Sequence, residues 1–479
     1  MKQPKALKVF FLTEMWERFG FYVNQAMLVL YLTQALSFSD ERSYAILGQF
    51  TALAYIMPII GGWACDRFLG NRMAVLSGGL LLCIGYALLS LNQDMLFLGL
   101  SLAAAGNGLL KPNISSFLGQ YYHVNDPRRE AGFTIFYVGI NTGVLLATLS
   151  AGYIRDFLGW SACFGAASLA LLIGVSVFRY GFRYFENKGL PPQNLQKVKI
   201  LLGFAAAIAV VYVLMVSEGL GSYALYGGGL FFLFYLIWLA IKSDEVFRTR
   251  IFAILLLFMI STVFWGLFFE IFLAVNLFTE RAVDRILWGH QIPASVFIGL
   301  EDIFIILIGP ALALMWQKLS ESARQGNSLM ERWFSIPMKF ALSLLLLGVS
   351  MQVLVFAIGQ SSSTAGVSAG WLVLFYLFVT LGELFISPIG LSMITEFMPA
   401  EYSGLMMGAW FMTLGFGGKL SGVLAQYASV PEGSQSVIEL NAIYQQAFQS
   451  YAWIGFAAFF VGLLFIPLVN RWLKVNIHH

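Results

Sequence analysis

The chain has 479 residues, of which 59% are hydrophobic and only 11% are charged, and its formal net charge is +3. Soluble globular proteins carry about 25% charged residues, so this composition excludes an ordinary soluble enzyme and indicates a polytopic membrane protein. Its mean hydropathy of +0.78 agrees. Nucleic-acid binding is not indicated, because the basic residues follow the rule for membrane topology.

Successive apolar segments along the chain each approach the ~20 residues that a membrane-spanning helix needs. We place fourteen of them, at 9–34, 43–65, 73–92, 95–121, 132–153, 159–179, 199–217, 220–241, 251–278, 294–316, 338–359, 370–395, 403–428 and 449–470. Of the 28 Lys and Arg residues, four fall in loops on one side (Arg42, Arg155, Arg281 and Arg285), three within spans, and the other 21 on the opposite side. Because Lys and Arg concentrate in cytoplasmic loops, we expect a multi-pass protein of the bacterial inner (plasma) membrane with both termini in the cytoplasm.

The longest basic connectors, 180–198, 242–250 and 317–339, bracket two spans with almost no ionisable residues. We therefore predict an all-α membrane protein with an N-terminal six-helix bundle at 1–180 and a C-terminal six-helix bundle at 251–479. Residues 181–250 would form a linker with two extra transmembrane helices. Two repeated halves with a site near the middle of the membrane are a common transporter plan.

The first span, Phe10 to Leu32, carries Glu14, Glu17 and Arg18 within its apolar sequence. Their spacing places them on one helix face. A charge at the centre of the membrane costs roughly 2.5–3.5 kcal/mol even on the lenient insertion scale. Such residues persist where they pair and line a polar path. Two carboxylates beside one guanidinium can also bind or release a proton, which predicts a proton-coupled membrane transporter.

The loop after the second span reads GGWACDRFLGNR over 61–72 and contains Asp66, Arg67 and Arg72. This spacing resembles the loop 2–3 signature of the major facilitator superfamily. An acid and two bases at a helix junction can bond to neighbouring helix ends and lock one conformation, which predicts a gating or structural role. The alternative is ordinary positive charge in a cytoplasmic loop.

In the N-terminal half, further polar side chains interrupt apolar runs. Lys111 lies in GNGLLKPNISS, where Pro112 removes a backbone donor and loosens the helix. We interpret Lys111 as a cation for a carboxylate of substrate or protein, with a structural salt bridge as the alternative. Hydrogen-bonding side chains that could recognise a peptide backbone are Tyr22, Tyr55, Tyr137 and Asn141. Any single tyrosine could equally serve only packing.

The C-terminal half has mainly acidic candidates. Glu383 and Ser387 lie one helical turn apart in LGELFISPIGLSM. Other polar or aromatic candidates are Trp265, Glu270, Asn276, Glu301, Asp302, Trp410 and Lys419. An anionic pole in this half and a cationic pole in the other half would suit a zwitterion.

Together these motifs resemble the proton-dependent oligopeptide transporter (POT/PTR) family of the major facilitator superfamily, along essentially the whole chain. Residues 14–22, EMWERFGFY, are similar to the family's ExxERFxYY motif. GGWACDRFLG and FYVGINTG resemble its two longer signatures. GNGLLKPN supplies the family's lysine as Lys111, and GELFISP supplies its acid as Glu383.

The resemblance implies uptake of di- and tripeptides driven by inward proton flow, through alternating access. Lys111 and Arg18 would serve the peptide carboxylate, and Glu383 the ammonium. Tyr22, Tyr55, Tyr137 and Asn141 would line the substrate site, and Trp410 would shape a side-chain pocket. From their positions in the sequence we add Ser387, beside Glu383, and Glu301 as candidate substrate-binding residues. Glu14, Glu17 and Glu383 would take part in proton coupling. We add Arg18, which lies beside the two acids of the first span, and Glu270 as further candidates for proton coupling. Protons are the coupling ion, no other cofactor is expected, and a monomer suffices.

The chain departs from the family pattern at several positions. Phe21 replaces the first Tyr of the motif, and Gln25 stands where many members carry a second Arg. Phe269 occupies the usual position of the seventh-span acid, with Glu270 next to it. Glu301 and Asp302 align with a common Asn-Pro pair. We hypothesise that Glu301 favours cationic or N-terminally charged substrates, or adds a proton site.

Another transporter, a membrane enzyme and a channel are the alternatives to a peptide symporter. A proton-coupled carrier of another small zwitterion or anion, or a drug exporter, would share this fold and machinery, and only substrate competition separates these possibilities. A membrane enzyme is not supported, because no Ser-His, Cys-His or metal-binding arrangement is visible. A channel or passive scaffold is disfavoured by the buried charges in both halves.

Overall fold

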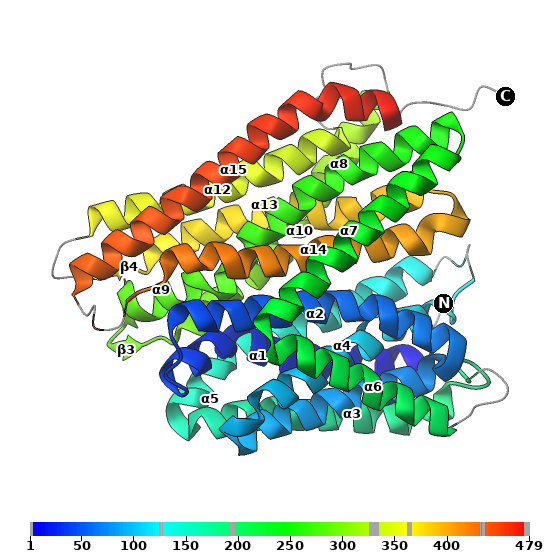
Figure 1. The fold of residues 1–479 in the computed structure, drawn as a ribbon, viewed down its shortest axis with the longest axis horizontal. Helices are drawn as coiled ribbons and strands as arrows, with labels where there is room; N and C mark the ends of the chain where they lie inside the picture. The colour runs from blue at the N-terminus through cyan, green and yellow to red at the C-terminus, as the bar shows by residue number, and fades with distance from the viewer. Residues whose placement is uncertain are drawn as a thin grey trace. The chain divides into compact units, whose positions relative to one another are not determined.

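The computed structural model describes residues 3–123, 126, 128–191, 197–324, 335–361, 366–431, 433 and 436–473. These residues are almost entirely helical (Figure 1). The helices of the first half are α1 (Ala6–Gln34), α2 (Asp40–Ala64), η1 (Cys65–Leu69), α3 (Gly70–Leu91), η2 (Gln93–Met95), α4 (Leu96–Gly119), α5 (Arg129–Tyr180), η3 (Gly181–Tyr184), α6 (Lys197–Val216) and α7 (Glu218–Lys242). The histidines that end the sequence lie outside the described residues.

The second half continues with α8 (Glu245–Phe268), η4 (Phe269–Phe272), α9 (Ala274–Ala282), α10 (Ala294–Arg324), α12 (Ile336–Gln360), α13 (Gly370–Phe397), α14 (Ala400–Leu424), η5 (Ala425–Ala428) and α15 (Val437–Leu473). Four two-residue strands form two small ladders. β1 (Val283–Asp284) pairs parallel with β4 (Val367–Ser368), and β2 (Ile286–Leu287) pairs antiparallel with β3 (His290–Gln291).

Within the described residues, nine helical stretches are long and apolar enough to cross a membrane. Two of them, Asp40–Leu91 with 52 residues and Arg129–Tyr184 with 56, are long enough for two crossings each. In the second stretch the break falls at Gly159, whose φ of +84° suits glycine. α1 is not among the nine, because its charged and amide side chains lower its hydropathy. The protein is therefore a multi-pass, all-α membrane protein.

One predicted span is not a continuous helix. The segment expected to cross at 251–278 is interrupted at η4, after which Leu273 has φ −109° and ψ −103°, outside the helical region. α9 then begins at Ala274. The interruption places the buried Glu270 in a short 3₁₀ turn rather than in a regular α-helix. Such short 3₁₀ segments often mark hinges in otherwise α-helical elements.

The chain folds as two compact units. Unit 1 comprises Met1–Phe38, Gln49–Ser222 and Pro293–Gly299, and unit 2 comprises Ser39–Gly48, Tyr223–Ile292 and Leu300–His479. The two extra helices are therefore divided, with α6 in unit 1 and most of α7 in unit 2. The expected three-part division at residues 180 and 250 stays a prediction.

In unit 1, α1 packs along α5, and α3 packs along both α4 and α5. Small residues bring α3 and α4 together: a Cβ atom on Gly78 would lie 2.7 Å from the Gly106 carbonyl oxygen, and one on Gly106 would lie 2.6 Å from that of Gly78. Either alanine would force the two helices apart. Membrane helices use small residues in this way because lipid provides no hydrophobic force that presses helices together.

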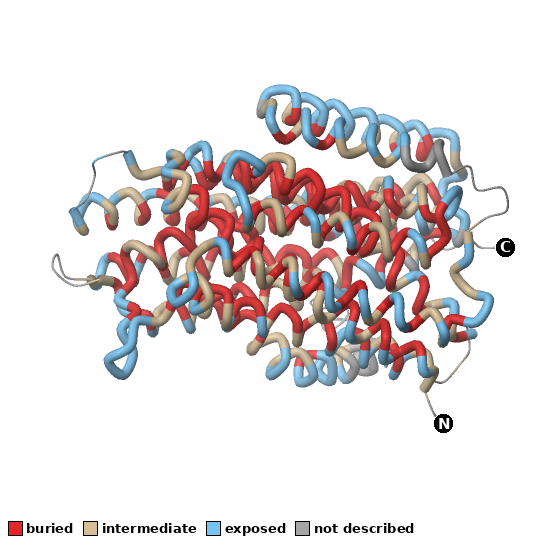
Figure 2. The backbone as a smooth tube through the Cα atoms, turned by 90° about the horizontal axis from the view of Figure 1, so that it is seen from below, coloured by how far each residue is buried: buried red, intermediate tan, exposed pale blue. Residues whose placement is uncertain are grey.

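In unit 2, α12 packs against α13 and α15, while α8 packs against α14 and α15. Buried residues follow the packed sides of the helices, and exposed residues lie on their other sides (Figure 2). Large apolar side chains such as Phe231, Trp453 and Leu464 are exposed. In a membrane protein these exposed apolar faces are the surface that contacts lipid.

A partly buried ion pair connects three parts of unit 2. Asp40, at the start of α2, accepts hydrogen bonds of 2.6 and 2.8 Å from the two terminal nitrogens of Arg281 in α9. It also accepts one of 3.0 Å from the Val430 backbone N–H. Arg281 in turn donates to the Tyr444 hydroxyl of α15 at 3.3 Å. The Asp40 side chain is only 5% exposed, so these donors replace water around its carboxylate.

We expect Asp40→Asn to lower the melting temperature of the purified protein clearly. The substitution leaves the Arg281 guanidinium without its counter-charge, and a hydrogen bond to a charged group contributes about 1.5–3 kcal/mol. Differential scanning fluorimetry in detergent measures the shift. Asp94→Asn is the matched control, because Asp94 is exposed in η2. Equal melting temperatures for Asp40→Asn and the wild type would show that the pair does not contribute to stability.

Candidate functional site

The charged residues of α1 form a compact buried cluster in unit 1. Arg18 Nε contacts Glu17 Oε2 directly and lies 3.4 Å from Glu14 Oε1. The side chains of Arg18 and Glu14 are each 4% exposed, and that of Glu17 is 1% exposed. The Arg18 guanidinium also lies 5.2 Å from the centre of the Phe21 ring. Arg18 is thus held by two acids, and a change in the protonation of either acid changes how tightly it is held.

An asparagine of α4 connects this cluster to two further helices. Arg18 Nη2 donates to Asn107 Oδ1 at 3.4 Å, and Asn107 Nδ2 donates to the Ala54 carbonyl oxygen of α2 at 2.6 Å. α1, α2 and α4 are therefore joined by one chain of polar contacts. Our sequence interpretation did not single out Asn107. Its position four residues before Lys111, on the same helix face, was the available signal.

Lys111 lies one turn further along α4 and has a different environment. Its Nζ atom is 4.3 Å from the centre of the Tyr55 ring of α2, which is a cation–π contact. None of the ion pairs between described residues includes Lys111. In contrast to Arg18, this ammonium is not in direct contact with a carboxylate of the described residues, so it can receive an external anion.

The other polar candidates of unit 1 differ in exposure. Tyr22 is half-buried beside Phe21, with ring centres 5.6 Å apart. Tyr137 of α5 is 52% exposed. Asn141 is buried, and its amide donates to the Tyr137 carbonyl oxygen at 2.9 Å. Part of its hydrogen-bonding capacity is therefore used within its own helix. Gln25 donates to the Thr51 hydroxyl at 3.1 Å, so it links α1 to α2.

The three charged residues near the junction of α2 and α3 have different surroundings. Arg72 donates to the backbone oxygens of Lys188, at 2.7 Å, and Glu186. Its guanidinium also lies 5.5 Å from the centre of the Phe182 ring. It thereby ties the start of α3 to the chain after α5. Asp66 and Arg67 are exposed on η1.

Gly70 allows the start of α3 to lie close to the backbone at Leu190. Its φ is +67°, and a Cβ atom there would overlap the Leu190 backbone carbonyl. A larger residue at this position would therefore meet both backbone strain and a steric clash.

Unit 2 contains a group of acids on two helices. Glu301 and Asp302 lie on α10 and are 6% and 3% exposed. Glu383 lies half-buried on α13. The Thr380 hydroxyl of α13 lies 3.4 Å from the Glu301 backbone oxygen, so α10 and α13 lie close together at this point. Ser387 lies one turn beyond Glu383 and is half-buried.

Two further candidates of unit 2 are enclosed by protein. Glu270 in η4 is 0% exposed, and within the described part of the chain neither of its carboxyl oxygens has a hydrogen-bond partner. Trp410 of α14 is 2% exposed, and its ring centre lies 6.0 Å from that of Phe258 and 6.1 Å from that of Phe340. A Cβ atom on Gly390 would overlap the Trp410 indole. Trp410 thus occupies a packed position in this structure.

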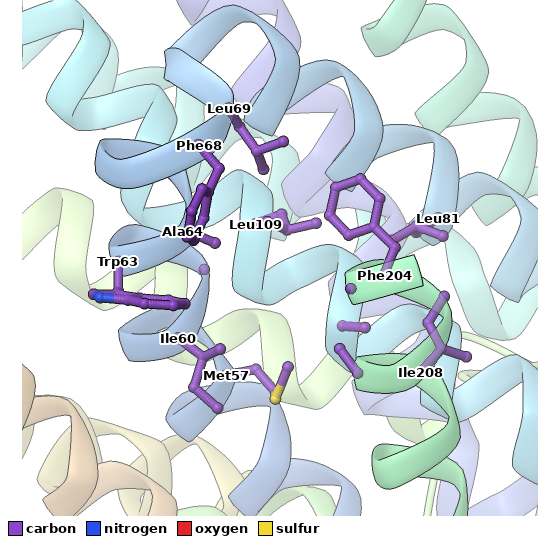
Figure 3. A pocket seen from close by; sticks show the side chains of 14 residues that line it. Met57, Ile60, Trp63, Ala64, Phe68, Leu69, Leu81, Leu109, Phe204 and Ile208 are labelled. Atoms are coloured by element: carbon purple, nitrogen blue, oxygen red, sulfur yellow. The ribbon is translucent and has the colours of Figure 1, made fainter. Parts of the chain in front are cut away.

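A cavity of about 400 Å³ lies elsewhere in unit 1, between α2, η1, α3, α4 and α6 (Figure 3). Its walls are apolar, with Trp63, Phe68 and Phe204 among the larger side chains, and none of the described residues that line it is ionisable. These walls offer no side chain that could bind the charged ends of a zwitterion.

Among the described residues there is no group of three or more His, Cys, Asp or Glu side chains that could hold a metal ion.

Long apolar helices that enclose charged side chains define a membrane transporter. The chain belongs to the POT family: the sequence profile of that family matches residues 72–454. A dipeptide and tripeptide permease A of Chromobacterium violaceum is 31% identical, over 98% of this chain and 94% of that protein.

Solved structures agree with this assignment. A mutant of a peptide transporter POT, in complex with alafosfalin, superposes with a TM-score of 0.85 at 31% identity, over 98% of this chain and 96% of that one. A tetrameric PepTSo2 gives a TM-score of 0.84 at 26% identity, over 98% of this chain and 99% of that one. The expected family and the major facilitator fold are thereby confirmed.

Proposed function

We propose that this protein is a symporter that imports di- and tripeptides together with protons by alternating access. The observation that carries the proposal is the buried Glu14–Glu17–Arg18 cluster, with Lys111 nearby as a cation outside the ion pairs of the described residues. The related dipeptide and tripeptide permease and the similar peptide-transporter structure support peptides as the substrate class.

The residues fall into two chemical sets. In unit 1, Lys111 binds the peptide carboxylate, and Arg18 contributes once it is released from its acids. Tyr22, Tyr55, Tyr137 and Asn141 supply hydrogen bonds to the peptide backbone. In unit 2, Glu383 receives the peptide ammonium, with Glu301, Ser387 and Trp410 shaping the rest of the site. Asp66, Arg67 and Arg72 act in gating.

Proton coupling follows from the contacts of Arg18. While Glu17 and Glu14 are ionised, they hold the guanidinium by charge-assisted bonds. A proton on Glu17 removes its negative charge and weakens this hold, so that Arg18 can turn toward a carboxylate. Protonation and peptide binding thereby favour each other. Glu270 and Glu383 are the proposed further proton carriers.

We further propose that the protein lies in the bacterial inner membrane with both termini in the cytoplasm. It would need no cofactor besides the coupling proton and would function as a monomer. The basic residues of its connectors support this orientation. The second candidate is transport of another small zwitterion or anion. The departures from the family pattern at Phe21 and Gln25 support this second candidate, because they change the polar side chains of α1.

Proteoliposomes containing the purified protein should accumulate labelled dialanine when an inward proton gradient is applied, and far less without one. Di- and tripeptides should compete with the label, whereas free alanine should not. Liposomes without protein and a protonophore are the controls. Absence of uptake and of competition, from protein shown to be folded, would exclude peptide transport. It would direct the search to other small metabolites.

A further inference from the structure

The apolar cavity of unit 1 extends along α2 (Figure 3). Phe68 and Leu69 line one end of it, and Met57 and Ile208 line the other. At 1.5 Å per residue, the helical stretch from Met57 to Leu69 is roughly 18 Å long. One leaflet contributes about 15 Å to the ~30 Å hydrocarbon core of a bilayer. The cavity therefore has about the length of a lipid acyl chain in one leaflet.

The η1 end of the cavity lies at the boundary between membrane and water. Asp66 and Arg67 are exposed there, and charged side chains avoid the hydrocarbon core because entering it is costly. Trp63 lines the cavity near this end and is exposed as well. Tryptophan is enriched at the membrane interface, which is the level of the lipid headgroups. The Met57 end of the cavity consequently lies deeper in the hydrocarbon core.

The cavity is continuous with the surface that contacts lipid. Ile60 and Phe68 line it and are exposed, so the cavity opens at the surface of unit 1. Phe204 of α6 forms part of the wall that faces α2 (Figure 3). Leu202 and Val210 of α6 are exposed apolar residues. Exposed apolar faces of membrane helices contact lipid, so lipid is the molecule that meets this opening.

Close helix packing separates the cavity from the proposed peptide site. Met57 of α2 and Leu109 of α4 line the cavity. Two positions away on the same helices, Tyr55 and Lys111 contact each other in the peptide site. Two positions correspond to a rotation of about 200°, so the cavity and the peptide site lie on opposite faces of both helices. A Cβ atom on Gly61 would overlap the backbone of α4, so the two helices touch.

We propose that this cavity binds one acyl chain of a membrane phospholipid, whose headgroup stays at the η1 end. Its volume of about 400 Å³ falls in the ~300–1,000 Å³ range of small-molecule sites. The chain extends from the level of Phe68 toward Met57 and packs between α2 and α6. The apolar walls give it the dispersion contacts that the bilayer would otherwise supply. This site is separate from the peptide site, so the inference holds whichever solute the protein carries.

Photocrosslinking in proteoliposomes tests the site in the full-length protein. The probe is phosphatidylglycerol with a diazirine at the end of one acyl chain, and mass spectrometry of the digested protein locates the adducts. Met57 and Leu109 line the cavity and are only 8% and 6% exposed, so lipid that merely surrounds the protein does not reach them. We expect adducts on these two residues in the wild type, and excess alanylphenylalanine should not reduce them.

Gly203→Leu fills the cavity and should lower the adducts on Met57 and Leu109 by about tenfold or more, a loss of about 1.4 kcal/mol or more in lipid binding. Gly203 lines the cavity, and a Cβ atom there would meet no other atom within 4 Å. Gly227→Leu is the matched control. Gly227 is an exposed glycine of α7 outside the cavity, and a Cβ atom there is equally free of clashes. This control should keep the wild-type adducts.

Three results would overturn the inference. Wild-type adducts confined to exposed residues such as Leu202 and Val210 would show surrounding lipid only. Undiminished adducts on Leu109 in folded Gly203→Leu would show that the lipid does not occupy this cavity. Loss of the adducts with excess alanylphenylalanine would show that the cavity receives a substrate side chain instead. The wild-type adduct map decides by itself if Gly203→Leu does not fold.

Discussion

Lys111→Ala is expected to abolish the accumulation of dialanine that an inward proton gradient drives. Arg18 is already engaged by Glu14 and Glu17, so Lys111 is the cation of this region that can receive an incoming carboxylate. Truncating one member of a buried charge pair costs about 2–5 kcal/mol. At 1.4 kcal/mol for each tenfold change, the affinity for peptide should fall by roughly 30-fold or more.

The measurement compares initial rates and final levels of dialanine uptake in proteoliposomes with matched amounts of folded protein. Lys8→Ala is the control, because Lys8 is an exposed lysine of α1 and should not affect transport. Lys111→Arg keeps the charge and should retain part of the uptake. If Lys111→Ala accumulates dialanine to the wild-type level, the lysine does not bind the peptide carboxylate.

Much of the fold could be predicted from hydropathy and spacing alone. The predicted segments at 43–65 and 73–92 fall within α2, η1 and α3 to within a residue, and those at 95–121 and 370–395 match α4 and α13 closely. Hydropathy works well here because a membrane span must satisfy its own backbone hydrogen bonds as a helix. It does not reveal where a helix is interrupted, and for this reason the break at η4 beside Glu270 was not foreseen.

The site was only partly predictable. Neighbours on one helix, such as Glu14, Glu17 and Arg18, can be placed on one face by counting residues. Contacts between helices cannot be found this way. The bonds from Asn107 to Arg18 and to Ala54 join positions 89 and 53 residues apart. The bond from the Thr380 hydroxyl to the Glu301 backbone oxygen likewise depends on how α10 and α13 pack together. The packed position of Trp410 between two phenylalanine rings could not be read from its own helix either.

Glu17→Gln is expected to reduce proton-driven uptake by about tenfold or more while largely sparing peptide exchange at equal pH. That loss corresponds to about 1.4 kcal/mol or more. Glu17 contacts Arg18 directly and has the least exposed side chain of the α1 cluster. A glutamine keeps the size of the side chain but cannot bind or release a proton. It resembles the protonated acid, so Arg18 should remain available to peptide. Exchange needs only peptide binding and the return of the loaded protein, whereas accumulation also needs the proton to leave.

The two assays together separate coupling from folding. Gradient-driven uptake and counterflow of labelled dialanine against unlabelled peptide should be measured in the same proteoliposomes. Glu245→Gln, at an exposed acid of α8, should behave as the wild type in both assays. Equal losses in uptake and exchange for Glu17→Gln would mean that its charge holds Arg18 for folding or general gating. A selective loss of uptake would place the coupling proton on the α1 cluster, because exchange alone does not require that proton to be released.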